Sequence, residues 1–346
     1  MESVQAYGTI GAAAPLAPLN IDRRETGPTD IEIEILYCGI CHSDIHQAKN
    51  EWGNSIYPMV PGHEIVGRVT AVGKNVTSFK KGDLAGVGCL VDSCRKCDHC
   101  LEGDEQLCLN GSVGTYNSVD KSGNPTFGGY SKKIIVDESF TLHISEKLDL
   151  KAVAPLLCAG ITTYSPLKRW NVSKGQQVAV IGLGGLGHMG VKIAAAMGAE
   201  VTVLSTSNNK EADAKKLGAK HFINTRNEDT PKKLAGKFDF ILNTISAPNS
   251  YNVALSYLKN KGTMVLVGAP PEPSEITGFS LILGNKNLAG SLIGGIKETQ
   301  EMLDFCETHN IVSDVEIIPI SKINEAYERV LRSDVKYRFV IDMATL

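Results

Sequence analysis

Hydrophobic and polar residues alternate in short runs through the first part of the chain. Residues 31–35 follow a strict two-residue period, and residues 65–72 and 132–136 are equally strand-like. Such alternation is typical of strands that bury one face, and the Gly, Asp and Pro residues between the runs favour turns. No long amphipathic pattern interrupts them. Residues up to about 150 are therefore predicted to form a mostly β domain.

The pattern changes near Leu150. Residues 177–181 are a nearly continuous apolar run typical of a buried strand, and a glycine-rich segment follows directly. Strand-like and helix-like segments then alternate, which predicts βαβ units and a parallel sheet. The predicted strands are 177–181, 200–204, 222–223, 238–242 and 264–267, and the predicted helices are 191–197 and 210–217, ended by Gly198 and Gly218.

The tail of the chain returns to a mixed pattern. It predicts helices over 298–308 and 323–332 and a last strand over 338–341. A chain of 346 residues is also too long for one ordinary core, so two domains are expected.

Composition narrows the classes of function. The chain is 42% hydrophobic and 21% charged, with a net charge of −3, which argues against broad electrostatic binding of nucleic acid or anionic membrane. It has no run of about 18 apolar residues, so no membrane span is expected. The first residues lack the basic segment of a signal peptide. We expect a small-molecule partner.

Nine cysteines are present, four of them within a stretch of fifteen residues. An odd count without a secretory signal favours metal binding over disulfides and predicts a cytoplasmic location. Cys94, Cys97, Cys100 and Cys108 have the spacing of a closed tetrahedral zinc site, which stabilises its loop and performs no chemistry. Iron–sulfur ligation also uses four cysteines, but nothing else indicates electron transfer.

The glycine-rich segment follows a predicted strand and opens a helix, the context that makes such a motif specific for a dinucleotide. Glycines allow a tight turn and let backbone amides approach a pyrophosphate. The predicted contacts are Gly182, Gly184, Gly185, Leu186 and Gly187.

A second possible metal set is dispersed along the chain, and each member is ambiguous alone. With their flanking sequences, these residues resemble the zinc-containing medium-chain dehydrogenase/reductase family over essentially the whole chain. The marker is Gly62-His63-Glu64-x-x-Gly67, continuing to Gly73 and Val76. Residues 57–64, 156–164, 290–294 and 297–301 look like its cinnamyl-alcohol dehydrogenase branch. The resemblance implies an α/β Rossmann domain, a doubly wound parallel sheet over 153–293, inserted in a mostly β GroES-like catalytic domain of 1–152 and 294–346.

The resemblance also implies the catalytic residues. Alcohol dehydrogenases are the known example of a catalytic zinc held by two cysteines and one histidine, here Cys41, His63 and Cys158. Glu64 enters the shell when water leaves, and Asp44 orients His63. Ser43 and His46 occupy the positions of a proton relay, although His46 as a plain surface histidine stays an alternative.

The residues at the end of the second predicted strand of the parallel sheet indicate whether the cofactor is NAD or NADP. An NAD enzyme usually places a carboxylate there, whereas residues 205–210 contain none. Ser205, Thr206, Ser207 and Lys210 are instead expected to hold the 2′-phosphate of NADP. Lys210 as a solvated lysine at a helix start is the alternative.

Further contacts follow from the resemblance alone. Around the cofactor they are His42, Thr162, Val267, Ala269, Ser291, Ile293 and Arg338. Trp52, Ile56, Tyr57 and Leu90 are candidates for the substrate pocket, with packing of the core as the equal alternative.

The chain is thus expected to carry two zinc ions and NADP(H) and to act as an alcohol dehydrogenase or aldehyde reductase on a broad range of aromatic and aliphatic primary alcohols and aldehydes. An NAD-dependent polyol or secondary-alcohol dehydrogenase is the alternative within the family. A protein that keeps zinc and dinucleotide without catalysis is the alternative from another class. A homodimer formed through the edge at 281–293 is also expected.

Overall fold

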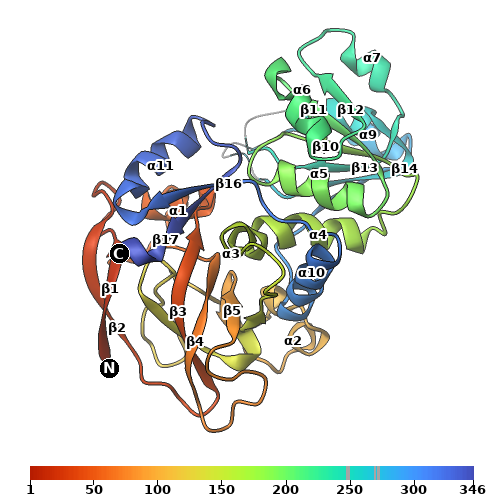
Figure 1. Cartoon of the computed structure of the whole chain (residues 1–346). Coiled ribbons are helices and arrows are strands. Elements are labelled where there is room, and N and C mark those ends of the chain that lie inside the picture. Colours follow the sequence, from red (N-terminus) through yellow and green to blue (C-terminus); the bar gives the residue numbers. More distant parts are fainter. Residues whose placement is uncertain (247–249, 269, 271–272) are drawn as a thin grey trace. The chain divides into compact units, whose positions relative to one another are not determined.

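The computed structural model describes residues 1–346 except 247–249, 269 and 271–272. The chain forms two compact units, Met1–Cys158 with Gly294–Leu346, and Ala159–Ile293 (Figure 1). The first boundary lies after Cys158, a few residues beyond the expected one at 152. Helix α3 (Leu150–Val153) and the 3-10 turn Ala154–Leu157 contact strands of the first unit, which keeps Cys158 in that unit.

The first unit is built on a seven-stranded sheet. Its strand order is β16-β17-β3-β4-β5-β9, with β8 also paired to β3, and all pairs are antiparallel except β16 with β17. The mostly β prediction is confirmed. The strands are β1 Glu2–Gly8, β2 Ala17–Arg23, β3 Asp30–Gly39, β4 Ile65–Val72, β5 Leu84–Val87, β6 Leu90–Asp92, β7 Val113–Gly114, β8 Lys133–Asp137, β9 Leu142–His143, β16 Val315–Pro319 and β17 Arg338–Asp342.

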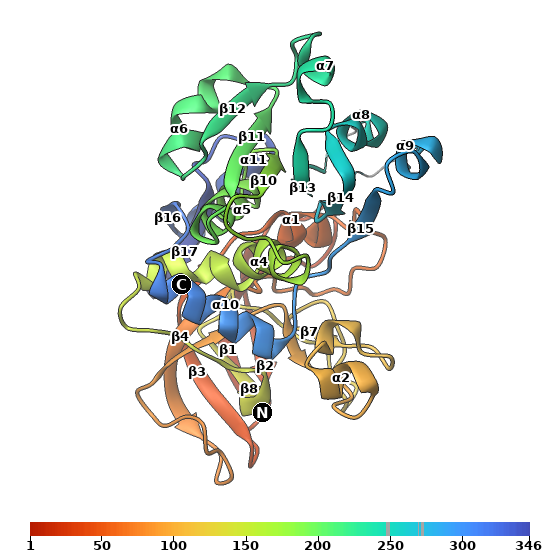
Figure 2. The same ribbon diagram turned by 90° about the vertical axis from the view of Figure 1, so that its right-hand side faces the viewer.

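Besides α3, four α-helices lie between the described strands of this unit. They are α1 His42–Ala48, α2 Asp98–Glu102, α10 Ile296–Thr308 and α11 Ile323–Leu331. The last two confirm the helices predicted for the tail. Figure 2 shows α2 in a lobe beside β7.

The pairing of β3 with β4 positions the first site. The two strands are antiparallel, with Cys38 opposite Ile65, so the end of β3 and the start of β4 lie at the same edge. The amide of Gly39 donates to the carbonyl of Glu64 at 2.9 Å. The loop that carries Cys41 and the residues just before β4 are therefore held side by side.

The second unit is a parallel six-stranded sheet, which confirms the predicted βαβ arrangement. Its order is β12-β11-β10-β13-β14-β15. The strands are β10 Gln177–Ile181, β11 Glu200–Ser205, β12 His221–Asn224, β13 Phe238–Asn243, β14 Leu258–Leu266 and β15 Asn287–Gly290. The helices are α4 Ala159–Arg169, α5 Gly187–Ala196, α6 Glu211–Lys216, α7 Thr230–Leu234, α8 Tyr251–Ser256 and α9 Phe279–Ile282.

This order is that of a doubly wound sheet. From the central β10 the chain builds outward through β11 and β12, then crosses to the other side for β13, β14 and β15. Ligands of such sheets bind outside the carboxyl ends of the strands, where the order reverses. The glycine-rich turn after β10 lies at this point, next to the end of β13.

The helices of this unit differ from the prediction in two ways. Helix α5 starts at Gly187 rather than at 191, so the third glycine of the motif is already helical. Helices α4, α7, α8 and α9 were not predicted. None of the helices in the described part of the chain is long and apolar enough to cross a membrane.

Candidate zinc centres and dinucleotide site

Four side chains converge at the edge where β3 ends and β4 begins. The possible ligand atoms of Cys41, His63, Glu64 and Cys158 all lie within 4.8 Å of one another, and all four residues are buried. The two sulfur atoms are 3.9 Å apart. Cys41 precedes α1, His63 and Glu64 precede β4, and Cys158 follows the turn after α3.

Asp44, on the first turn of α1, holds this cluster together. Its carboxylate accepts from the amide of Cys41 at 2.8 Å and from the amide of Gly62 at 3.1 Å. It also lies 3.1 Å from Nδ1 of His63. A proton on Nδ1 shared with Asp44 leaves Nε2 of His63 as the atom free to bind a metal.

Electrostatics distinguish the two cysteines of the cluster. The hydrogen bond from the Cys158 thiol, together with Arg338 and His63, lowers the pKa of Cys41 well below its usual value despite burial. The same contact with Cys41, the neighbouring Cys89 and burial raise the pKa of Cys158. Within the pair, the thiolate form is therefore favoured at Cys41 rather than at Cys158.

Glu64 is held on one side by an ion pair that the sequence did not predict. One carboxylate oxygen, Oε1, accepts from the guanidinium of Arg338, and both side chains are buried. The other, Oε2, has no hydrogen-bond partner among the described residues. Burial raises the pKa of Glu64 to about 8, although Arg338 opposes that shift.

These donors fit a zinc ion. Two sulfurs and one imidazole nitrogen are the ligands of an open zinc site, and the orphaned oxygen of Glu64 lies within the same 4.8 Å group. A buried polar atom without a partner is costly, and a metal ion would satisfy it.

The cluster of Cys94, Cys97, Cys100 and Cys108 also meets the geometry of zinc. A tetrahedral shell with Zn–S bonds of about 2.3 Å separates its sulfurs by about 3.8 Å. The separations in the structure are 3.9 Å for Cys94–Cys100, 3.5 Å for Cys97–Cys100 and 4.0 Å for Cys97–Cys108. Four sulfurs fill the shell and leave no open position.

The predicted relay residues lie on α1. The hydroxyl of Ser43 is 3.8 Å from the sulfur of Cys41. Nδ1 of His46 is 2.5 Å from a carboxylate oxygen of Glu51, an acidic partner that the sequence analysis missed. The ring of Trp52 lies 5.2 Å from that of His46 and is more than half exposed.

The other substrate candidates differ in burial. Ile56 is exposed, the hydroxyl of Tyr57 donates to the carbonyl of Ala48 at 2.9 Å, and Leu90 is buried. His42 is exposed at the start of α1.

In the second unit, the glycine-rich turn has the backbone that a dinucleotide needs. Gly182 has a φ of 92°, and a Cβ there would lie 2.5 Å from Ile245. A Cβ on Gly187 would lie 2.2 Å from the carbonyl oxygen of Gly182. A Cβ on Gly184 would instead enter open space, the side from which a pyrophosphate can approach the backbone.

The segment after β11 contacts this turn. Lys210 is half-buried, and its ammonium donates to the carbonyl of Leu183 at 2.9 Å. Burial lowers the pKa of Lys210. Ser205 is buried at the end of β11, whereas Thr206 is exposed and Ser207 is half-buried. A hydroxyl-rich strand end and a lysine beside the glycine turn therefore form one polar corner.

The remaining predicted cofactor residues lie in different parts of the structure. Val267 and Ser291 follow β14 and β15, at the same carboxyl edge as the glycine turn. Ile293 follows with a φ of 34°, and Thr162 is buried in α4. Ala269 lies outside the described residues. Arg338 belongs to the first unit, where it contacts Glu64.

The geometry defines a class of proteins, oxidoreductases built from a mostly β zinc unit and a doubly wound nucleotide unit. Comparison with known proteins agrees. Residues 27–146 match the family described as alcohol dehydrogenase GroES-like domain, and residues 185–308 match zinc-binding dehydrogenase. The chain belongs to the zinc-binding alcohol dehydrogenase family.

Similar proteins cover the whole chain. It is 56% identical to NADP-dependent alcohol dehydrogenase C 1 of Mycolicibacterium smegmatis, over 100% of this chain and 99% of that protein. It is 54% identical to aldehyde reductase YahK of Escherichia coli, over 99% of both. The structure of a cinnamyl alcohol dehydrogenase from Helicobacter pylori complexed with NADP(H) is 45% identical, with a TM-score of 0.93 over 99% of this chain and 98% of that one. The predicted family and branch are confirmed.

Proposed function

We propose that this protein is a zinc- and NADP-dependent alcohol dehydrogenase, or aldehyde reductase, that interconverts primary alcohols and aldehydes. The observation that carries the proposal is the buried set of Cys41, His63 and Cys158 with an unpartnered carboxylate oxygen beside it. The activities named for the Mycolicibacterium and Escherichia relatives support it. Their names do not agree on one substrate, so we propose a broad range of aldehydes.

Cys41, His63 and Cys158 would hold the zinc of the open site, and Glu64 would be an additional ligand. A zinc ion in such a site polarises an alcohol or carbonyl oxygen. Asp44 would hold the Nδ1 proton of His63, which leaves Nε2 as the nitrogen that can bind the metal. Arg338 holds the other end of the Glu64 carboxylate and limits how far it can turn.

Ser43 and His46 would move the alcohol proton. The Ser43 hydroxyl lies beside Cys41, where it can accept a hydrogen bond from a substrate alcohol. His46 is partly exposed, and its Nδ1 lies 2.5 Å from a carboxylate oxygen of Glu51. A proton that reaches His46 can therefore pass to solvent.

NADP is favoured over NAD by the corner after β11. Ser205, Ser207 and Lys210 can donate hydrogen bonds to a 2′-phosphate, and no carboxylate in residues 205–210 would repel it. The Helicobacter cinnamyl alcohol dehydrogenase was solved with NADP(H), which supports the same choice. An NAD-dependent polyol dehydrogenase would need an acidic residue at this strand end, and residues 205–210 contain none.

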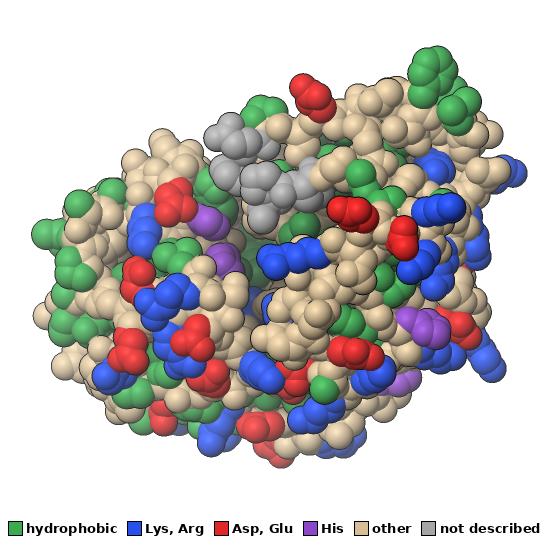
Figure 3. Space-filling model, turned by 90° about the horizontal axis from the view of Figure 1, so that it is seen from above, with side chains coloured by type: hydrophobic (Ala, Val, Ile, Leu, Met, Phe, Trp, Pro, Cys, Tyr) green, Lys and Arg blue, Asp and Glu red, His purple; other side chains and the backbone are tan. Residues whose placement is uncertain are grey.

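Cys94, Cys97, Cys100 and Cys108 would hold a second zinc with a structural role. All nine cysteines are free of disulfides, which supports a reducing compartment such as the cytoplasm. Charged side chains of both signs are interspersed on the face seen in Figure 3.

A homodimer would use the edge of the six-stranded sheet. Strand β15 is last in the strand order, and large apolar side chains are exposed next to it, with Phe279, Ile282, Leu283 and Leu292 each at least 60% exposed. Unpaired edges and exposed apolar patches mark association surfaces. Light scattering of the variant Leu283→Asp tests this surface, because it should be monomeric where the wild type is a dimer.

Reduction of a panel of aromatic and aliphatic aldehydes with NADPH and with NADH tests the proposed function. We expect turnover with NADPH and two zinc ions per chain. Cys158→Ala should lose turnover and one zinc while staying folded. The matched control is Cys306→Ala, which removes a buried sulfur from helix α10 and should keep both. Aldehyde reduction by Cys158→Ala at the wild-type rate would refute the proposal.

A further inference from the structure

The carboxylate of Asp44 receives more hydrogen bonds than its contact with His63 alone requires. Its Oδ1 receives those of the Gly62 amide and His63, and its Oδ2 receives that of the Cys41 amide. The fourth donor is the hydroxyl of Tyr130, at 3.1 Å from Oδ2. A carboxylate offers about four acceptor positions, so this one is saturated. Asp44 is fully buried, and its orientation is fixed by all four donors.

Tyr130 is itself held against the segment that leads to His63. Its amide donates to the carbonyl of Pro61 at 3.1 Å, and the preceding amide of Gly129 donates to the carbonyl of Gly62 at 2.8 Å. A Cβ on Gly62 would lie 2.8 Å from the ring of Tyr130, so the ring packs directly on the glycine backbone. The backbone of Tyr130 thus holds the two residues that precede His63, and its phenol reaches Asp44, the carboxylate partner of the same histidine.

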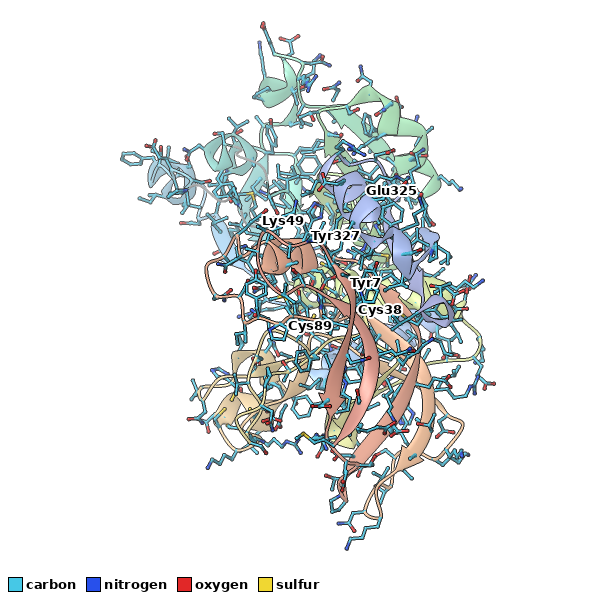
Figure 4. The ribbon with its side chains drawn as sticks, turned by 90° about the vertical axis from the view of Figure 1, so that its left-hand side faces the viewer. Tyr7, Cys38, Lys49, Cys89, Glu325 and Tyr327 are labelled. Carbon is cyan, nitrogen blue, oxygen red and sulfur yellow. The ribbon has the colours of Figure 1, made fainter. Side chains whose placement is uncertain are left out.

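A second buried tyrosine contacts the hydroxyl of the first. The hydroxyl of Tyr327 donates to the hydroxyl oxygen of Tyr130 at 3.5 Å, and both side chains are buried. Tyr130 then uses its own single proton for Asp44. Tyr327 belongs to helix α11, which contacts α1, and Figure 4 labels it together with Cys38 of β3.

We propose that Tyr130 is a positioning residue of the open zinc site, supported by Tyr327. Its phenol fixes the carboxylate of Asp44, and the carboxylate fixes the ring of His63 with Nε2 directed at the two sulfurs. The ligand geometry therefore depends on a hydrogen-bond chain that runs from α11 through Tyr130 to α1. This inference rests on the proposed function, because it assumes a zinc ion at Cys41, His63 and Cys158.

The variants Tyr130→Phe and Tyr327→Phe, each lacking one oxygen atom, test the chain. The matched control is Tyr251→Phe, a buried tyrosine of the second unit. Cobalt substituted into the open site reports ligand geometry through its visible absorption, and a chelator assay reports the rate of zinc loss. Thermal unfolding of each variant and kcat with KM for NADPH complete the set.

Loss of a hydrogen bond behind a metal-bound histidine typically lowers metal affinity or activity by about 10- to 100-fold. We expect Tyr130→Phe to lose open-site zinc about tenfold faster, with an altered cobalt spectrum, a lower kcat and an unchanged KM for NADPH. Tyr327→Phe should shift in the same direction by less, and Tyr251→Phe should match the wild type.

Two other outcomes would contradict the role of Tyr130, and they differ in whether the proposed function also fails. If Tyr130→Phe is only less stable, with the cobalt spectrum and zinc loss of the control, Tyr130 has a structural role and the inference is wrong. If the wild type itself holds one zinc, in the four-cysteine site, the proposed function fails and this inference fails with it.

Discussion

Replacing Asp44 with asparagine changes charge and hydrogen-bond polarity at the centre of the open site without changing shape. The carboxylate accepts four hydrogen bonds, two on each oxygen, whereas an amide has one accepting oxygen and a donating nitrogen. The amide oxygen can keep the donors on one side only. The other two donors then face an NH₂ group.

The loss of folding stability depends on whether the two donors that face the NH₂ group can reverse their hydrogen bonds. If the amide oxygen keeps His63 and Gly62, the NH₂ group faces the Tyr130 hydroxyl and the Cys41 amide. The hydroxyl can turn and accept, but a backbone N–H cannot. One buried donor without an acceptor costs about 1–3 kcal/mol. Loss of the negative charge beside His63 should also weaken zinc binding about 10- to 100-fold.

Urea unfolding of the zinc-loaded protein measures the first effect, and competition with a chelator measures the second. Asp22→Asn, at an exposed aspartate of β2, is the control for a change of one charge elsewhere in the same unit. We expect Asp44→Asn to lose stability and zinc affinity together. An Asp44→Asn variant that binds zinc as tightly as the control would refute the view that this carboxylate sets the ligand geometry.

Three further outcomes are expected. Cys97→Ser should lower the thermal unfolding midpoint and leave one zinc and the kcat of the folded fraction, because a structural zinc contributes folding free energy; an unchanged midpoint would contradict it. Lys210→Ala should raise KM for NADPH about 10- to 100-fold, the equivalent of a hydrogen bond to a charged group, and equal effects on NADPH and NADH kinetics would argue against a phosphate contact. Gly62→Ala should cost roughly 1–3 kcal/mol in backbone strain alone at its φ of 103°, and its Cβ would also crowd Cys38 and Tyr130 at 2.8 Å; calorimetry that finds wild-type stability would contradict this.

Local patterns predicted most of the fold because they report which face of an element is buried. The strand over 65–72 is reproduced as predicted, and the helices of the tail differ by two residues or fewer. Helix α4 was missed for the same reason. Nine of its eleven residues are buried, so it has no polar face to mark a helical period, and it contains Pro166. The pattern of polar and apolar residues therefore does not indicate such a helix.

The residues that form hydrogen bonds or ion pairs with the site residues were harder to predict than the site residues themselves. Cys41, His63 and Cys158 were named from the family resemblance, but Glu64 was not expected to pair with Arg338, which is 274 residues further along the chain. Tyr130 was not singled out, because a tyrosine after two glycines has no distinctive spacing relative to Asp44, 86 residues earlier. Glu51 was missed because an acidic residue in a surface turn is common.

The sequence by itself determined the two kinds of unit, the four-cysteine site and the glycine-rich turn, because each of these is written in neighbouring residues. Only the tertiary structure decided how the open site is assembled. The antiparallel register of β3 and β4 sets Cys41 beside His63, the turn after α3 adds Cys158, and Tyr130 and Arg338 arrive from other strands and loops. Contacts between residues so far apart in the chain exist only once the sheet has formed, since nothing local encodes which strand edges will meet.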